Sequence, residues 1–323
     1  MSKGPILVTG GAGFIGSHVC EALLGQGRSV RCFDNLATGK RANVEHLQAD
    51  PHFAFVEGDL RSMDDVRNAV AGASAVVHLG ALGSVPRSIA DPLATEAVNL
   101  TGFVHLLEAA RAAGVKRIVY ASSSSVYGDS TELPKREGTE GRALSPYAVT
   151  KAMDEAYAHL YHRMHGMELV GLRFFNVFGE RQDPKGPYAA AIPKFIRSLL
   201  RHEAPTVNGD GRQTRDFTYV GNAVQAVLCG LKADGAALGR VFNIAYGDRC
   251  DLLTLVGLLR THLSAIDPAI ADVGITHAPE RPGDVRDSLA DIGLAKDLLG
   301  YAPAFDLAAG LARAVPWYAE HWR

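Results

Sequence analysis

The sequence lacks several features that define large classes of proteins. Its four cysteines are scattered over 323 residues without a C-x-x-C pair, which argues against a disulfide framework and against a zinc or other metal site. A net charge of −2 and a pI of about 6.6 provide no basic surface for nucleic acid or anionic lipid. No apolar run approaches the roughly 18 residues of a membrane span. The N-terminal apolar run fits a strand better than a signal peptide, so we expect a cytoplasmic protein.

The sequence does contain a glycine-rich segment, which follows directly after an apolar run at residues 5–9. Gly11 allows a tight turn, Gly13 lets the backbone approach a pyrophosphate, and Gly16 lets the next helix pack against the strand. We expect that helix over about residues 14–24, with its N-terminal N–H groups facing the phosphates. The segment therefore predicts a site for a dinucleotide, the alternative being a glycine-rich turn without a ligand.

A second apolar run, at residues 29–33, leads into Asp34 about 20 positions after the glycines. A carboxylate at this place accepts hydrogen bonds from the ribose hydroxyls of NAD and repels the 2′-phosphate of NADP. Asn35, Leu36 and Ala37 follow without an arginine that could offset this repulsion. The pattern therefore favours NAD as the cofactor.

Strand-like and helix-like segments alternate through the first half of the chain. We expect further strands at residues 53–56, 75–79, 117–121 and 169–173, and long helices at 92–113 and 146–165. Such alternation predicts an α/β fold, a Rossmann doubly wound parallel sheet with ligands beyond the carboxyl ends of its strands. We assign residues 1–175 plus about 217–245 to an NAD-binding domain. Residues 176–216 plus about 246–323 form a smaller C-terminal substrate-binding domain.

A tyrosine and a lysine, Tyr147 and Lys151, are spaced so that both lie on one face of the second long helix. A free tyrosine has a pKa of about 10, and a nearby ammonium together with the positive nicotinamide ring lowers it. Tyr147 could then act as a base towards an alcohol that Ser123 holds in place. The alternative is a Tyr–Lys pair on a helix surface, which the glycine-rich segment and the serine-rich strand end disfavour.

Taken together with several further segments, these motifs make the chain resemble the extended short-chain dehydrogenase/reductase family over nearly its full length. The resemblance lies in TGGAGFIG at 9–16, SSSSVYG at 122–128, YAVTK at 147–151 and LRFFN at 172–176. GDG at 209–211 and RPGD at 281–284 resemble diphosphate-binding segments of the nucleotide-sugar 4-epimerases. ALGSVPRS at 81–88 and the stretch 181–194 are most similar to bacterial UDP-N-acetylglucosamine/UDP-N-acetylgalactosamine 4-epimerases.

The resemblance implies roles for individual residues. Ser123, Tyr147 and Lys151 would be catalytic. The cofactor would contact Gly10, Gly13, Phe14, Ile15, Gly16, Asp34, Asn35, Gly39, Asp59, Leu60, Leu79, Ala81, Asn99, Tyr147 and Lys151. The substrate would contact Gly83, Ser84, Ser124, Ser125, Asn176, Gln182, Ala189, Ala190, Arg215, Arg281, Asp284 and Ser288. Within that set Arg215 and Arg281 would pair with phosphates, and Ser288 would line the carbon 2 side of the sugar, where a small residue admits an N-acetyl group.

The implied function is an NAD-dependent 4-epimerase that interconverts UDP-N-acetylglucosamine and UDP-N-acetylgalactosamine during polysaccharide synthesis, with UDP-glucose and UDP-galactose as a second candidate pair. A 4,6-dehydratase would need an Asp–Glu pair where this chain has Ser124 and Ser125. A 4-epimerase of UDP-glucuronate or its N-acetylamino form is the alternative enzyme, and an NAD(H)-sensing binding module is the alternative without catalysis. The resemblance also implies a homodimer through a four-helix bundle formed by the helices at 92–113 and 146–165.

Overall fold

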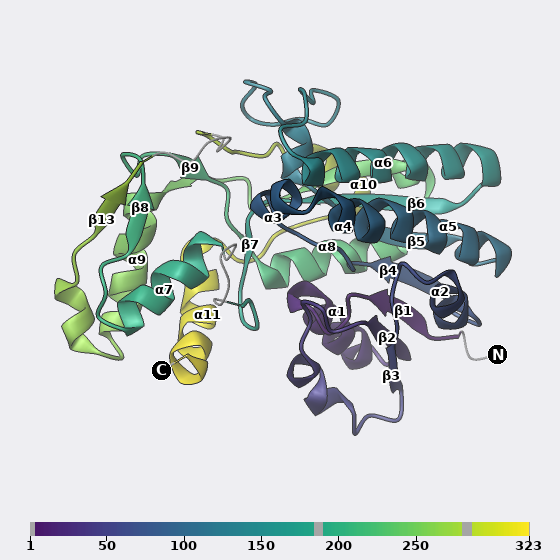
Figure 1. Cartoon of the computed structure of the whole chain (residues 1–323), viewed down its shortest axis with the longest axis horizontal. Coiled ribbons are helices and arrows are strands. Elements are labelled where there is room, and N and C mark those ends of the chain that lie inside the picture. Colours follow the sequence, from purple (N-terminus) through teal and green to yellow (C-terminus); the bar gives the residue numbers. More distant parts are fainter. Residues whose placement is uncertain (1–3, 184–189, 280–285, 323) are drawn as a thin grey trace.

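The computed structural model describes residues 4–183, 190–279 and 286–322 (Figure 1). Three of the residues expected at the substrate, Ala189, Arg281 and Asp284, lie outside the described residues. Within the described ranges no helix is both long enough and apolar enough to cross a membrane.

A seven-stranded sheet in the order β11-β6-β5-β4-β1-β2-β3 forms the centre of the molecule, and every neighbouring pair is parallel. This confirms the predicted fold class. The strands are β1 (Ile6–Thr9), β2 (Val30–Asp34), β3 (Phe53–Glu57), β4 (Ala75–His78), β5 (Arg117–Ser123), β6 (Glu168–Phe174) and β11 (Arg240–Ile244).

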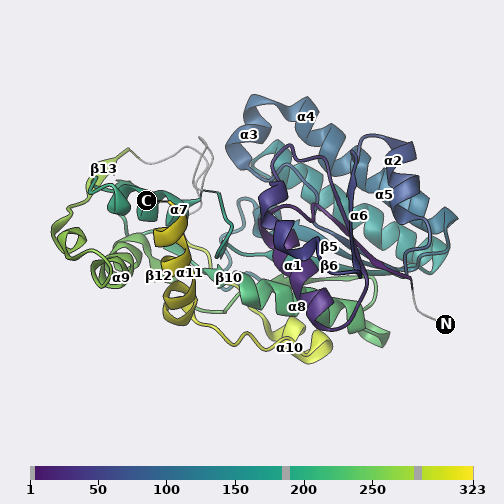
Figure 2. The same ribbon diagram turned by 90° about the horizontal axis from the view of Figure 1, so that it is seen from below.

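Helices cover both faces of this sheet because successive side chains of a strand point to opposite sides. Ile6 and Val8 of β1 belong to a buried cluster with α1 (Phe14–Gly25) and α8 (Val220–Lys232). Leu7, between them, belongs to a second cluster with α2 (Met63–Val70), α5 (Gly102–Ala112) and α6 (Pro146–His165). Figures 1 and 2 show these two helical layers on either side of the strands.

The helix expected over residues 92–113 is interrupted. It consists of α4 (Pro92–Glu96), a single π-helical turn (Ala97–Thr101) and α5. Such turns insert one extra residue per turn and often occur at functional sites. Here the turn contains Asn99, whose side chain is buried against the loop after β4.

A third buried cluster lies under the short elements of the C-terminal part, where Phe195, Leu259 and Leu311 meet. Three two-stranded pairs, β7–β10, β8–β13 and β9–β12, surround it. The remaining elements are α3 (Val85–Ala90), β7 (Val177–Phe178), α7 (Ala191–Leu200), β8 (Thr206–Asn208), β9 (Thr214–Arg215), β10 (Thr218–Tyr219), β12 (Cys250–Asp251), α9 (Leu252–Ser264), β13 (Thr276–Ala278), α10 (Gly293–Leu299) and α11 (Leu307–His321).

The carboxylate of Asp216 joins three segments that are distant in sequence. It accepts backbone N–H groups from Tyr246, Gly247 and Ala290, each at 3.2 Å. Asp216 is fully buried, and this burial raises the pKa of its carboxyl to about 7 despite those hydrogen bonds. The ionised form is therefore less stable inside the fold than in the unfolded chain.

The pKa of Asp216 predicts how stability changes with pH. Its folded pKa is raised, so its contribution is complete below the unfolded pKa of about 3.9 and is lost as the pH rises through about 7. Asp216→Asn keeps an acceptor but does not titrate. Between pH 4 and pH 7 the unfolding free energy of the wild type should fall relative to this variant, by at most about 1.4 kcal/mol per pH unit. Urea unfolding of both proteins measures the difference. Asp272→Asn, at an exposed carboxylate, is the control, and a constant difference for Asp216→Asn would contradict the account.

Candidate active site

A groove with a volume of about 430 Å³ lies at the carboxyl ends of β1, β2 and β4. It brings together most of the residues expected to hold the cofactor. Its lining includes Gly10, Gly13, Phe14, Ile15, Gly16, Asp34, Asn35, Asp59, Leu60, Leu79 and Ala81, together with Gly83 from the substrate set.

The wall of this groove between β1 and α1 leaves no room for side chains. A Cβ atom on Gly16 would lie 2.1 Å from the carbonyl oxygen of Gly10, and one on Gly13 would lie 3.0 Å from the same atom. Gly10 has a φ of +65°, and its Cβ would lie 2.6 Å from the nitrogen of Gly80. The bare backbone and the N-terminus of α1 are therefore exposed to a ligand, which suits the pyrophosphate of a dinucleotide.

Asp34 organises the loop beside that wall. Its Oδ2 accepts the N–H of Ala12 at 3.0 Å, and its Oδ1 accepts the N–H of Leu36 at 2.8 Å. Burial raises the pKa of its carboxyl, and these two hydrogen bonds oppose that rise. Gly39 lies close by, since a Cβ there would be 2.8 Å from either carboxylate oxygen. Both carboxylate oxygens can still accept further hydrogen bonds at the edge of the groove, where the ribose hydroxyls are expected.

The groove is also lined by Asp59, which follows β3. Its carboxylate accepts hydrogen bonds from Asn35 Nδ2 at 2.9 Å and from the guanidinium of Arg61 at 2.7 Å. The bonds to Arg61 hold the pKa of Asp59 well below its usual range. Arg61, which also lines the groove, was not among the expected residues.

Lys151 carries a charge into the interior of the protein. Helix α6 is capped by Ser145, whose hydroxyl accepts the N–H of Ala148, and the helix places Lys151 with 2% of its surface exposed. Its Nζ donates to the carbonyl oxygen of Ala121 at 3.0 Å. Ala121 also lines the groove. The ammonium therefore lies directly behind the groove wall, while Tyr147, one turn earlier, is half-buried.

Asp154 is the second partner of Lys151 and was missed from the sequence. Its Oδ2 accepts from Lys151 Nζ at 3.0 Å, and only 1% of Asp154 is exposed. Among the described residues its Oδ1 has no partner. Burial favours the neutral amine, but Asp154 and Tyr147 outweigh it and raise the pKa of Lys151, whereas burial raises the pKa of Asp154 to about 6. The i,i+3 spacing of the two residues was the available signal.

The serine-rich segment lies at the end of β5. Ser123 is the last residue of that strand, and its hydroxyl oxygen accepts the N–H of Ser125 at 3.2 Å. Ser124 and Ser125 begin a 3₁₀ turn (Ser124–Tyr127), and the buried hydroxyl of Ser125 has no partner among the described residues.

Two further polar residues fix the surroundings of the groove. Asn99 Oδ1 accepts the N–H of Leu82 at 2.7 Å and its Nδ2 donates to the hydroxyl of Thr150 at 3.2 Å, so it joins the groove loop to α6. The buried His78 lies with its Nδ1 2.7 Å from the Thr9 hydroxyl. Burial lowers the pKa of His78 to about 3.

The residues expected to contact the substrate do not line a single groove, unlike most of those expected to contact the cofactor. Arg215 donates to the carbonyl oxygens of Thr214 and Arg286, and the N–H of Ser288 donates to the same Thr214 oxygen at 3.2 Å. Asn176 donates to the backbone of Asp216 at 3.0 Å. Ser84 caps α3 and Ala190 precedes α7. Gln182 lies in the wall of a different cavity.

Comparison with known proteins identifies the family and the fold. The model of the "NAD dependent epimerase/dehydratase family" matches residues 6–245. The chain is 37% identical to a putative UDP-glucose 4-epimerase of Methanocaldococcus jannaschii, over 97% of each chain. It superposes with a TM-score of 0.91 on a UDP-N-acetylglucosamine 4-epimerase of Methanobrevibacter ruminantium, at 36% identity over 99% of each chain. A UDP-glucuronic acid 4-epimerase of Bacillus cereus, solved with NAD, gives 0.89 at 30% identity, over 98% of this chain and 99% of that one.

The Lys151–Asp154 pair predicts a change in the pH dependence of activity. Asp154→Asn removes the charge that offsets the burial of Lys151, so the pKa of Lys151 should fall. Activity that requires the ammonium is lost as the pH rises through that pKa. The alkaline limb of the kcat profile should therefore move to lower pH, by about one unit or more. Asp91→Asn, at an exposed helix cap, is the matched control. An unshifted limb in a folded Asp154→Asn enzyme would show that Asp154 does not position the charge.

Proposed function

Because the chain belongs to the NAD dependent epimerase/dehydratase family, we propose that it is a UDP-sugar 4-epimerase acting on UDP-N-acetylglucosamine and UDP-N-acetylgalactosamine. The observation that carries the proposal is the buried Lys151 ammonium, held against the groove wall one helical turn from Tyr147. It provides a fixed positive charge where a phenolate must form.

Tyr147 and Ser123 divide the proton chemistry between them. The Ser123 hydroxyl holds the hydroxyl group at carbon 4 of the sugar against Tyr147. The phenolate of Tyr147 accepts the proton of that hydroxyl and returns it after the 4-keto sugar has presented its other face. The glycine-lined groove and Asp34 would hold NAD, which when bound would supply the hydride acceptor and donor for carbon 4. Since the reaction regenerates NAD, no added cofactor is required.

The residues after Ser123 favour an epimerase over a dehydratase. A 4,6-dehydratase must also remove the proton at carbon 5 and expel the hydroxyl at carbon 6, which requires an acid and a base. Ser124 and Ser125 carry hydroxyls that stay protonated at neutral pH, so they cannot replace an Asp–Glu pair.

The second candidate is a UDP-glucuronate 4-epimerase, favoured by the similarity to the Bacillus cereus structure. The sugars of the two candidate reactions differ in the groups attached to carbons 2 and 5. Ser288 supports the N-acetyl sugar, because it is small and half-buried and its backbone lies beside Arg215, the expected phosphate ligand.

An apolar stripe supports a homodimer. On α6, Val149, Met153, Leu160 and Met164 are exposed at helical spacing, and Leu93 of the neighbouring α4 is 81% exposed. Two such helices from each of two copies would form a four-helix bundle that removes this stripe from water.

Replacement of the base tests the enzymatic role. Tyr147→Phe should still bind NAD and UDP-sugar, but its turnover should fall by about 10²–10⁴, the usual contribution of a general base. Turnover is measured on purified protein without added cofactor. Tyr157→Phe, on the same helix, should turn over normally. A near-normal rate for Tyr147→Phe would disprove the mechanism, and a wild type that binds NAD without turnover of any UDP-sugar would favour the sensing module.

A substitution that fills the sugar pocket tests which sugar is the substrate. Ser288→Tyr should lower kcat/KM for the N-acetylated sugars by about 5- to 150-fold while sparing the plain ones, because overfilling a packed pocket costs about 1–3 kcal/mol. The ratio of the two kcat/KM values is the readout. Ser264→Tyr, at the end of α9, controls for added bulk. An unchanged ratio would remove Ser288 as the determinant, and a wild type that prefers UDP-glucuronate would support the second candidate.

A further inference from the structure

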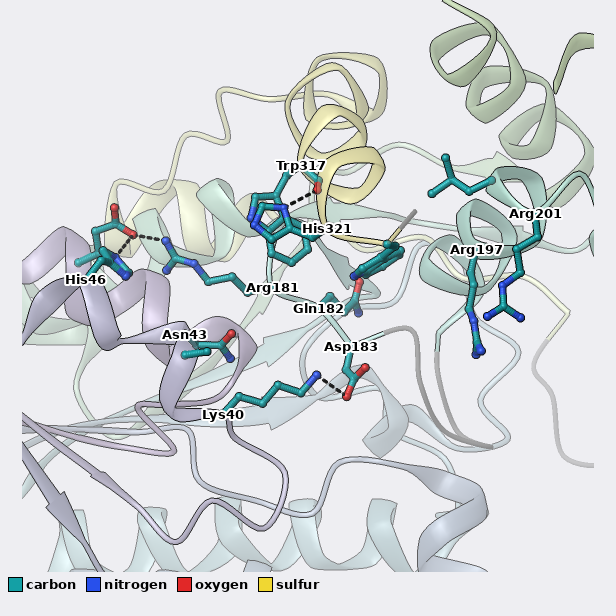
Figure 3. Close-up of a pocket in the computed structure, with 14 residues that line it drawn as sticks. Lys40, Asn43, His46, Arg181, Gln182, Asp183, Arg197, Arg201, Trp317 and His321 are labelled. Atoms are coloured by element: carbon teal, nitrogen blue, oxygen red, sulfur yellow. Dashed lines mark hydrogen bonds and ion pairs between the residues drawn. The ribbon is translucent and has the colours of Figure 1, made fainter. Parts of the chain in front are cut away.

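A second cavity, larger than the groove at about 760 Å³, lies between the Rossmann sheet region and the ends of α7 and α11 (Figure 3). It shares no lining residue with the groove. Six of the side chains that line this cavity are basic or aromatic and provide positive charge and flat apolar surface. They are Lys40, Arg181, Arg197, Arg201, Trp317 and Trp322.

The positive charges of this cavity are only partly balanced. Lys40 pairs with Asp183 at 2.9 Å, and Arg181 pairs with Glu21 at 2.6 Å. No carboxylate within the described ranges pairs with Arg197 or Arg201. These two arginines are four residues apart and leave the same side of α7 (Figure 3). They therefore present two guanidinium groups side by side.

The position of Arg197 and Arg201 also has a purely structural explanation. Cations at the C-terminal end of a helix interact favourably with the helix dipole. In that case they would be expected to donate to the last carbonyl groups, yet neither makes such a bond in the described parts of the chain. Their donors remain available for a ligand, and guanidinium groups suit the paired oxygens of phosphates.

Flat aromatic rings complete the wall opposite the arginines. Trp317 and Trp322 are the only two tryptophans of the chain, and both line the cavity. Trp317 stacks on His321 with ring centroids 4.3 Å apart, and Trp322 packs on Tyr318 at 4.1 Å. Rings held in place in this way can stack on a nucleobase irrespective of its identity.

From this combination we propose that the cavity is a second nucleotide site, which takes a nucleoside diphosphate with its phosphates on Arg197 and Arg201 and its base against the tryptophans. The site is separate from the groove and from the residues expected at the sugar, apart from Gln182. It does not depend on the function proposed above.

Tryptophan fluorescence tests the proposal directly, because both emitters lie in the cavity. ADP is titrated into protein saturated with NAD, so that the groove is occupied. We expect saturable quenching by ADP and a Kd that rises at least about tenfold in the double variant Arg197→Gln/Arg201→Gln. The control is Arg163→Gln/Arg240→Gln, which removes two exposed arginines outside the cavity and should leave the Kd unchanged.

Two competitors separate the contributions of phosphate and base. Inorganic pyrophosphate should displace ADP but bind more weakly, and adenosine should not compete at matched concentration. Absence of quenching, or quenching with the same Kd in the arginine double variant, would overturn the proposal. Pyrophosphate binding as tightly as ADP would also overturn it, because the cavity would then be a simple anion site.

Discussion

The structure depends on holding one ammonium group, that of Lys151, almost completely out of water. A charge in the interior is costly unless it is paired and hydrogen-bonded. Here the carbonyl of Ala121 and the carboxylate of Asp154 provide those partners. Ala121 belongs to β5 and lines the groove, so the position of the charge requires the sheet, α6 and the groove to be in register. Among the described residues the Oδ1 of Asp154 has no hydrogen-bond partner, so this buried pair stabilises the fold less than a fully hydrogen-bonded pair would.

The parallel sheet explains why the candidate site forms where it does. Its parallel strands end at one edge. Strands β2 and β5 contribute lining or candidate catalytic residues there, and the segments that directly follow β1 and β4 contribute the rest of that wall. The close approach of Gly10 and Gly16 lets α1 begin directly at this edge. A groove with a bare backbone wall and a buried cation behind it can bind a dinucleotide and activate a phenol at the same place.

Much of this arrangement could be predicted because its signals are local. Apolar runs located the central strands, and the bounds predicted for the helix at residues 146–165 are confirmed by α6. Helix α2 was missed, although its Ser62 cap and its buried residues Val66, Ala69 and Val70 follow a helical pattern. Strand β5 extends two residues beyond the predicted end, which places Ser123 on the sheet itself.

What could not be predicted depends on tertiary burial. Strands β8 and β13 pair across about 70 residues of sequence. The i,i+3 spacing places Asp154 beside Lys151, but the burial of both side chains, which gives the pair its effect, is set by the tertiary fold. The second cavity is assembled from five separated segments, the first at Glu21 and the last at Trp322. No single stretch of sequence predicts such a site, because each segment taken alone has the amino-acid composition of an ordinary solvent-exposed segment.

The most direct test of the central claim, that the site moves a hydride at carbon 4 and performs no other carbon chemistry, is incubation with UDP-N-acetylglucosamine in heavy water. The account predicts UDP-N-acetylgalactosamine as the product, without added cofactor and without deuterium on any sugar carbon, because the transferred hydride would be carried as a C–H of the cofactor, which does not exchange with water. Deuterium at carbon 5 or 6 of the product, or a dehydrated 4-keto sugar, would contradict it.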